Sequence, residues 1–363
     1  MLQIQVNTAC EGPLALNDNA FELCRDFLPP NGATFFTQVS RYDNYLAGVA
    51  KRPGYNVGDS LKLILPFLKS VGLTNDRLAE YSRQNISLMP KAEAAYRFLH
   101  SLKLPLFAVS ACYRPFAAAV ADRLGFAPER LFCTELDLDR YELPESGSEE
   151  LRQLVGKIAA APGIDLPPDT KTLEDLAPAV QEAIRLLDDV FWDTIPRMDI
   201  GRIYQETNTL GGPEKAKAVE DSLAQTGLAL TNAMYIGDNI TDVPALQKVR
   251  AGGGVALAFN GSRHAIAAAE IIVVADTAWP VALLAAVFRH WGKDGVVELA
   301  QSTRPGASRY LVLPEALIEP IAMGLQGGTF NLYHPETSRR EDVFRDSEAM
   351  RRRLRGEDVA YLG

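Results

Sequence analysis

Six short apolar runs, separated by segments with helical spacing, limit the folds open to this chain of 363 residues. The runs are Leu2–Val6, Leu104–Val109, Leu131–Leu136, Ala233–Ile236, Val255–Ala258 and Ile271–Val274. Each is short enough to be a buried strand, and apolar residues three and four positions apart in the intervening segments indicate helices. Because strands that alternate with helices form a parallel sheet with right-handed crossovers, we expect an α/β fold with a Rossmann-like parallel sheet core.

Two long helical segments interrupt this alternation. Residues 17–100 lie between the first two strand-like runs, and residues 144–204 form a second helical insert with an acidic composition. The C-terminal extension, residues 301–363, contains one strand-like stretch, Tyr310–Leu313. The remaining segments make up the expected α/β core, residues 1–16, 101–143 and 205–300.

Charge and composition argue against several classes of function. The net charge of −9 disfavours a sequence-independent nucleic-acid surface, which needs clustered cations. One basic run lies near the C-terminus and is expected to be a solvated helix face: Arg351, Arg352, Arg353 and Arg355. No apolar stretch reaches the ~18 residues of a membrane helix, and the N-terminus does not look like a signal peptide. We therefore expect a cytoplasmic chain with reduced cysteines and no membrane partner, in which Cys10 points into the core.

Residues that could take part in catalysis or binding follow the predicted strands in a regular order. Ala9-Cys10-Glu11-Gly12-Pro13 comes after the first strand, Ser110 ends the second, and Lys215 opens a helix after two glycines. Gly237-Asp238-Asn239-Ile240-Thr241-Asp242 follows a later strand. Ligands bind outside the carboxyl ends of the strands in an open parallel sheet. Two carboxylates four residues apart at such an end suit Mg²⁺, although an acidic turn that caps the next helix has the same pattern. Each residue taken alone also has a structural explanation, so the prediction depends on their joint order.

This ordered set resembles the signature motifs of the haloacid-dehalogenase-like (HAD) phosphatase superfamily. Members similar to phosphoserine phosphatase have a DxD or DxE pair, a Ser or Thr, a Lys and a GDxxxD sequence in this order. The resemblance covers roughly residues 1–136 and 205–290. It implies that residues 17–100 form a helical cap which closes over the substrate. The EGP sequence also looks like an uncharacterised, mostly archaeal branch that is labelled a hydrogenase-associated subunit.

The resemblance assigns a catalytic role to each matching position. Ala9 stands where the family has the aspartate that becomes an aspartyl-phosphate. Glu11 would be the general acid/base, Ser110 and Gly12 would contact the phosphoryl group, and Lys215 would neutralise its charge. Because a methyl group cannot attack phosphorus, the chain as it stands is expected to lack the covalent step.

The resemblance also implies a cofactor and a substrate side. Mg²⁺ would be held by the backbone carbonyl of Glu11 and by Asp238, with Asp242 completing the metal-binding set. In the cap, Arg41 and Tyr42 are candidates for contacts to the substrate, with a solvated helix surface as the alternative.

Three functions remain open at this point. The first is a Mg²⁺-dependent phosphomonoesterase, a hydrolase of a small phosphorylated metabolite, inactivated at Ala9. The second is a phosphotransferase that uses the same intermediate, and the third is a non-catalytic pseudo-phosphatase that binds a ligand or a partner. Ala9 itself is explained either by a substitution made to trap substrate or by a natural pseudo-enzyme. The oligomeric state stays open, with a homodimer through residues 144–204 as one option.

Overall fold

The computed structural model describes residues 1–167, 169–302 and 313–360, and its centre is a sheet of seven strands. The strands are β1 (Gln5–Thr8), β2 (Leu106–Tyr113), β3 (Leu131–Thr134), β4 (Ala233–Gly237), β5 (Val255–Phe259), β6 (Ile271–Ala275) and β7 (Phe330–Tyr333). They lie in the order β3-β2-β1-β4-β5-β6-β7, and every neighbouring pair is parallel except β6 and β7. The prediction of a Rossmann-like α/β fold is therefore confirmed.

Helices cover both faces of the sheet, so all residues of the inner strands β1, β4, β5 and β6 are buried. On one face, a hydrophobic cluster includes residues of α5 (Ala92–Ser101), α6 (Arg114–Leu124) and α13 (Trp279–Gln301). On the other, a second cluster includes residues of α10 (Pro213–Thr226), α11 (Val243–Ala251), α12 (Arg263–Ala268) and α15 (Arg340–Arg355). Helix α5 falls within the segment 17–100 yet packs on the sheet, where it belongs to the crossover between β1 and β2.

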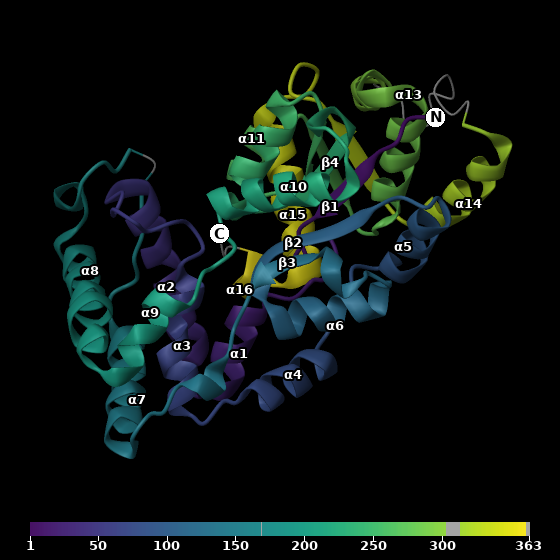
Figure 1. Cartoon of the computed structure of the whole chain (residues 1–363). Coiled ribbons are helices and arrows are strands. Elements are labelled where there is room, and N and C mark those ends of the chain that lie inside the picture. The colour runs from purple at the N-terminus through teal and green to yellow at the C-terminus, as the bar shows by residue number, and fades with distance from the viewer. Residues whose placement is uncertain (168, 303–312, 361–363) are drawn as a thin grey trace.

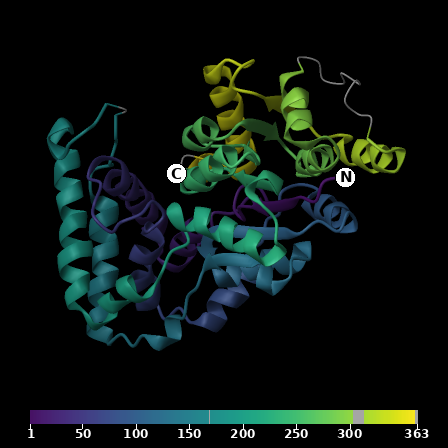
Figure 2. The same ribbon diagram turned by 45° about the horizontal axis from the view of Figure 1, so that its top comes forward.

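The two helical inserts share one hydrophobic cluster, which meets the sheet at Tyr113, the last residue of β2. It joins α1 (Asn19–Phe27), α2 (Gly32–Asn44) and α3 (Ser60–Ser70) to α7 (Glu145–Ala160), α8 (Pro178–Asp189) and α9 (Ile203–Glu206). Helix α4 (Asn75–Gln84) contributes Leu78 to the same cluster and contacts α6. We call α1–α3 and α7–α9 together the helical cap. In both views its purple and teal helices stand together beside the sheet (Figure 1, Figure 2).

The C-terminal extension is built into the core. After α14 (Glu315–Leu325), β7 pairs with β6 and adds an antiparallel edge strand that the sequence pattern did not indicate. Of the predicted strand Tyr310–Leu313, residues 310–312 lie outside the described residues. Helix α15 then packs on the sheet, and α16 (Glu357–Ala360) lies between the sheet and the cap, where Val359 joins the cap cluster (Figure 1). None of the described helices is both long and apolar enough to cross a membrane.

The strand order fixes where a ligand can bind. Strand β1 is central, with β2 on one side and β4 on the other. Chain connections run outward in opposite directions from β1 and β4, so their carboxyl ends flank a crevice at the point where the strand order reverses. The predicted motifs after β1 and after β4 therefore face the same crevice.

Candidate functional site between the sheet and the cap

Ala9 follows directly after β1 and is 2% exposed. Its amide donates to the carbonyl of Ile236 in β4 at 2.8 Å, which fixes the strand end. The next residue, Cys10, points into the core as expected and is fully buried. Gly12 then turns the chain with φ of +89°, and a Cβ at Gly12 would lie 2.4 Å from Cγ of Asp238. Only glycine lets the β1 loop approach the β4 loop this closely.

The buried pair of Lys215 and Asp242 joins two of the predicted motifs. Lys215 Nζ lies 2.6 Å from Asp242 Oδ1 and 2.9 Å from the hydroxyl of Thr241. The hydroxyl of Tyr235 donates to the same oxygen of Asp242 at 2.7 Å. The other oxygen, Oδ2, accepts from the amides of Asp238 and Asn239, both at 3.0 Å. Since both oxygens accept hydrogen bonds from within the protein, Asp242 positions the β4 loop and does not face outward as a metal ligand.

Asp238 is paired with two arginines of the C-terminal helix α15. Its Oδ2 accepts from Nη1 of Arg351 at 3.1 Å and from Nη1 of Arg355 at 3.4 Å. The three side chains are 4–7% exposed. Burial raises the pKa of Asp238, and the two guanidinium groups act in the opposite direction. The predicted solvated helix face is therefore wrong for Arg351 and Arg355, although it holds for Arg353, which is exposed.

A sequence signal for this pairing does exist. Arg351 and Arg355 lie four residues apart, so they share one face of a helix. Val343, Phe344 and Ser347 lie on the same face and are buried. The stripe of buried residues at three- and four-residue spacing thus continues into the two arginines, which indicates that this face packs inward.

The residues present do not fit a Mg²⁺ site. Ala9 contributes no carboxylate, Asp242 is saturated by internal hydrogen bonds, and Asp238 already accepts from two guanidinium groups. Within residues 1–167, 169–302 and 313–360, no group of three or more His, Cys, Asp or Glu side chains is placed to hold a metal ion. A hard divalent cation needs several oxygen ligands that are free to turn toward it.

A cavity of about 100 Å³ lies between the strand ends and the cap. Glu11, Asp18 and Asn19 line it on the side of the β1 loop, and Asn239–Thr241 line it on the side of the β4 loop. The amide of Asn19 donates to Glu11 Oε1 at 2.6 Å. Burial and the neighbouring Asp18 raise the pKa of Glu11 to about 8. The Glu11 carboxyl is therefore mainly protonated at neutral pH and can donate a hydrogen bond.

Asn19 has the clearest unused hydrogen-bonding capacity at this cavity. Its side chain is 1% exposed, and neither its amide nitrogen nor its amide oxygen has a hydrogen-bond partner among the described residues. A buried amide without a partner is costly unless a ligand or water satisfies it. Asp18, the residue before Asn19, caps helix α1 by accepting a hydrogen bond from the amide of Phe21.

The cap contributes different residues from those expected. Ser40, Asp43 and Asn44 of α2 line the cavity. By contrast, the hydroxyl of Tyr42 is bonded to Asp188 and Trp192, away from the cavity lining. Arg41 is exposed, and its Nη1 lies close to Gly163 in the second insert, 3.3 Å from the point that a Cβ at Gly163 would occupy. The structure thus places Arg41 and Tyr42 against the other half of the cap and outside the lining of the cavity.

Asp43 links the cap segments that surround the cavity. Its carboxylate accepts from the hydroxyl of Tyr55 at 2.6 Å and from the amides of Gly58 and Ser60. Burial raises its pKa to about 6. On the sheet side, Ala111, Cys112 and Tyr113 line the cavity, whereas the predicted Ser110 is a buried residue within β2.

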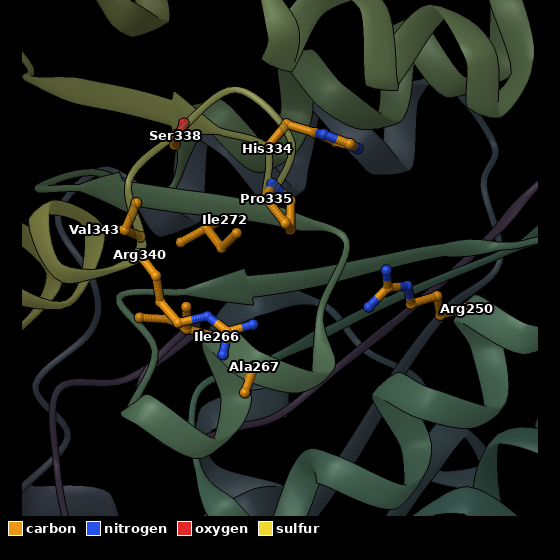
Figure 3. Close-up of a pocket in the computed structure, with 9 residues that line it drawn as sticks. All are labelled: Arg250, Ile266, Ala267, Ile272, His334, Pro335, Ser338, Arg340 and Val343. Atoms are coloured by element: carbon orange, nitrogen blue, oxygen red, sulfur yellow. The ribbon is translucent and has the colours of Figure 1, made fainter.

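Another pocket, of about 110 Å³, lies away from the strand ends (Figure 3). Its lining combines Arg250 and Arg340 with the apolar side chains of Ile266, Ile272 and Val343. It contains none of the predicted site residues, so the crevice at β1 and β4 stays the candidate site.

Comparisons with known proteins support the fold along the whole chain. Neither a protein-family model nor a curated protein matches the sequence. A solved structure of a gene product from Archaeoglobus fulgidus is 28% identical, with a TM-score of 0.79 over 99% of both chains. A HAD family hydrolase from Salmonella enterica serovar Typhi is 10% identical, with a TM-score of 0.39 over 71% of this chain and 64% of that one. At that score the likeness carries no argument about family or chemistry.

Proposed function

We propose that the crevice between the sheet and the cap binds a small phosphorylated metabolite and that this chain retains the ligand without hydrolysing it. One observation carries the proposal. By the family resemblance Ala9 stands at the position of the attacking carboxylate, and Glu11, Lys215, Asp238 and Asp242 are held at the same edge of the sheet as Ala9. The site therefore keeps two hydrogen-bond donors, the protonated carboxyl of Glu11 and the ammonium group of Lys215, but lacks the atom that would form a covalent intermediate.

The residues around the cavity suit the binding of an ester of phosphoric acid. The protonated carboxyl of Glu11 can donate to an ester oxygen, and the unsatisfied amide of Asn19 can donate to or accept from the ligand. The cap, through Ser40 and Asn44, would supply contacts that discriminate among ligands.

A second candidate is an enzyme of the same class, a phosphomonoesterase or a phosphotransferase that forms an aspartyl-phosphate. It is favoured by Glu11, whose pKa of about 8 lies close to that of an effective general acid at neutral pH. This candidate needs an aspartate at position 9 and, as the family resemblance implies, Mg²⁺. We also propose that the protein works in the cytoplasm.

The first experiment measures binding and phosphate release side by side. Thermal shift and calorimetry with inorganic phosphate and a panel of phosphate monoesters should show a ligand that stabilises the chain. Asn19→Ala should weaken that binding about tenfold, the effect of one hydrogen bond to a charged group. Asn331→Ala, on the exposed edge strand β7, is the matched control.

Phosphate release then separates the two candidate functions. The chain as it stands should release no phosphate from any ester, with Mg²⁺ or with EDTA. Release by the unaltered chain would contradict the binding proposal. Release by Ala9→Asp alone would establish the second candidate, and added alcohols that lower the yield of free phosphate would identify a phosphotransferase.

A further inference from the structure

The cations nearest to Asp238 belong to the C-terminal extension, which the motifs of the site do not include. Arg351 and Arg355 both donate to Oδ2 of Asp238. We propose that these two arginines act as the cations of the site and take the place of a divalent metal on Asp238. The inference rests on the proposed function, because it assumes that Asp238 belongs to a phosphate-ester site.

The two guanidinium groups do more than balance one carboxylate. Arg351 Nη1 also donates to the backbone carbonyls of Asp238 at 3.2 Å and of Asn260 at 3.1 Å. Arg355 donates to the carbonyls of Leu16 at 2.9 Å and Asn17 at 2.7 Å. Together they bind oxygens of the loops after β1, β4 and β5. A metal ion would collect carboxylate and carbonyl oxygens in the same way, and the five donors of arginine allow one side chain to do so.

The space beside Asp238 is too small for a hydrated ion. A cavity of about 10 Å³ is lined by Gly12, Asp238, Arg351 and Arg355, with Met89 and Leu354 among its other neighbours. That volume is close to the minimum for a single water molecule. Mg²⁺ in proteins usually keeps several waters, so it would have to displace both arginines to reach Asp238. Two positive charges at the carboxylate also repel a divalent cation.

The net charge of this cluster agrees with the assignment. The guanidinium groups of Arg351 and Arg355 interact with the carboxylates of Asp238 and Asp18, and Lys215 pairs with Asp242. The two arginines therefore balance these two carboxylates without a metal ion, and a ligand bound at the crevice would not need a divalent cation for that purpose. Binding of such a ligand should be equally strong in the presence of Mg²⁺ and of EDTA.

The test is a titration with Mn²⁺, followed by the electron paramagnetic resonance signal of the free ion, in four proteins. The Ala9→Asp background is needed because weak Mn²⁺ binding by the unaltered chain could result simply from the absence of a carboxylate at position 9. Ala9→Asp alone should bind Mn²⁺ no better than the unaltered chain. Ala9→Asp combined with Arg351→Met and Arg355→Met should bind it at least ~10-fold more tightly. Ala9→Asp with Arg353→Met, on the exposed side of the same helix, should behave like Ala9→Asp.

Equal Mn²⁺ affinity in Ala9→Asp with and without the two arginines, whether tight or undetectable, would overturn the proposal. If the double arginine change prevents folding, Arg355→Met alone in the Ala9→Asp background replaces it. Asp238→Asn supplies an independent measurement: in EDTA its Tm should fall, because the arginines lose their carboxylate even without metal. An unchanged Tm in EDTA would contradict the inference. Titration of the unaltered chain with inorganic phosphate tests the proposed function separately, since its failure would leave the Mn²⁺ comparison intact.

Discussion

Gly12 and Asp238 show how closely the two loops of the site approach. The carboxylate of Asp238 occupies the space next to Gly12 that a side chain would need, and Gly12 has a left-handed backbone. Glu11, the residue before it, is held with a protonated carboxyl by burial and by Asp18. At the scale of single residues, the site is thus defined by one missing side chain at Gly12 and one missing carboxylate at Ala9.

Replacing Gly12 by alanine should destabilise the fold strongly. The new Cβ would lie 2.4 Å from Cγ of Asp238, and the positive φ is unfavourable for alanine. We expect a loss of about 3 kcal/mol in the free energy of unfolding, measured by urea denaturation. Gly54→Ala is the control, because Gly54 has φ of +75° but open space around it, and it should cost only about 1 kcal/mol. Equal losses in both variants would show that Asp238 yields to the methyl group.

Glu11 should make stability fall as pH rises. Its pKa is 4.5 in the unfolded chain and about 8 in the folded one, so the folded state binds more protons between these values. The contribution is fully present below about pH 4.5 and is lost as pH rises through about 8. Glu11→Gln has no such proton to lose, so between pH 5 and pH 9 its free energy of unfolding should rise by about 4 kcal/mol relative to that of the unaltered chain.

Urea denaturation across this pH range measures the difference. Glu22, with a pKa of about 7, and Asp43, with a pKa of about 6, remain in the variant, so part of the pH dependence should persist. A parallel pH profile in Glu11→Gln would contradict the assignment of a raised pKa to Glu11.

Helix α15 presents two faces with different electrostatic roles. Arg351 and Arg355 point inward to Asp238, whereas Arg353 pairs with Asp276 at the surface. Ser347, one turn before Arg351, donates to the carbonyl of Gly261 and anchors the helix beside the β5 loop. As an element, α15 therefore brings two cations to the loops that follow β1, β4 and β5.

The two faces should respond very differently to loss of charge. Arg351→Met leaves a buried carboxylate with one cation fewer, and we expect a loss of about 3–5 kcal/mol in unfolding free energy. Arg353→Met removes a pair whose arginine is 54% exposed and should cost less than about 1 kcal/mol. Asp238→Asn combined with Arg351→Met should recover part of the loss in a double-mutant cycle. Similar costs for both single arginine variants would mean that Arg351 is not held by Asp238.

At the scale of the molecule, the two inserts behave as one body because neither could bury its apolar face alone. Phe35 and Phe67 of the first insert pack with Phe191 and Leu187 of the second in a single cluster. Tyr42 strengthens this contact through Asp188 and Trp192. The chain thus makes its cap from two segments that are separated by β2 and β3.

A cavity in the second insert should loosen the first as well. Leu187 is fully buried in the shared cluster, and Leu187→Ala should cost about 2–5 kcal/mol. Hydrogen exchange followed by mass spectrometry should then show faster exchange in both α2 and α8, with the sheet unaffected. Leu246 of α11 is equally buried but packs on the sheet. Leu246→Ala should therefore speed up exchange in α11 and the sheet and leave exchange in α2 and α8 unchanged. Faster exchange confined to α8 would show that the two inserts open independently.

The sequence by itself determined the parallel sheet and the order of its strands' motifs, because short buried runs and their flanking polar residues are local patterns. It also predicted the core orientation of Cys10 and brought Lys215, Asp238 and Asp242 to one edge of the sheet. Only the tertiary structure decided what surrounds Asp238, since Arg351 lies 113 residues away in the chain. Tertiary packing also decided the pairing of β7, which the sequence pattern did not predict, and the positions of Arg41 and Tyr42. Long-range packing selects the partner of a charged side chain, and no local spacing specifies which buried carboxylate an arginine will reach.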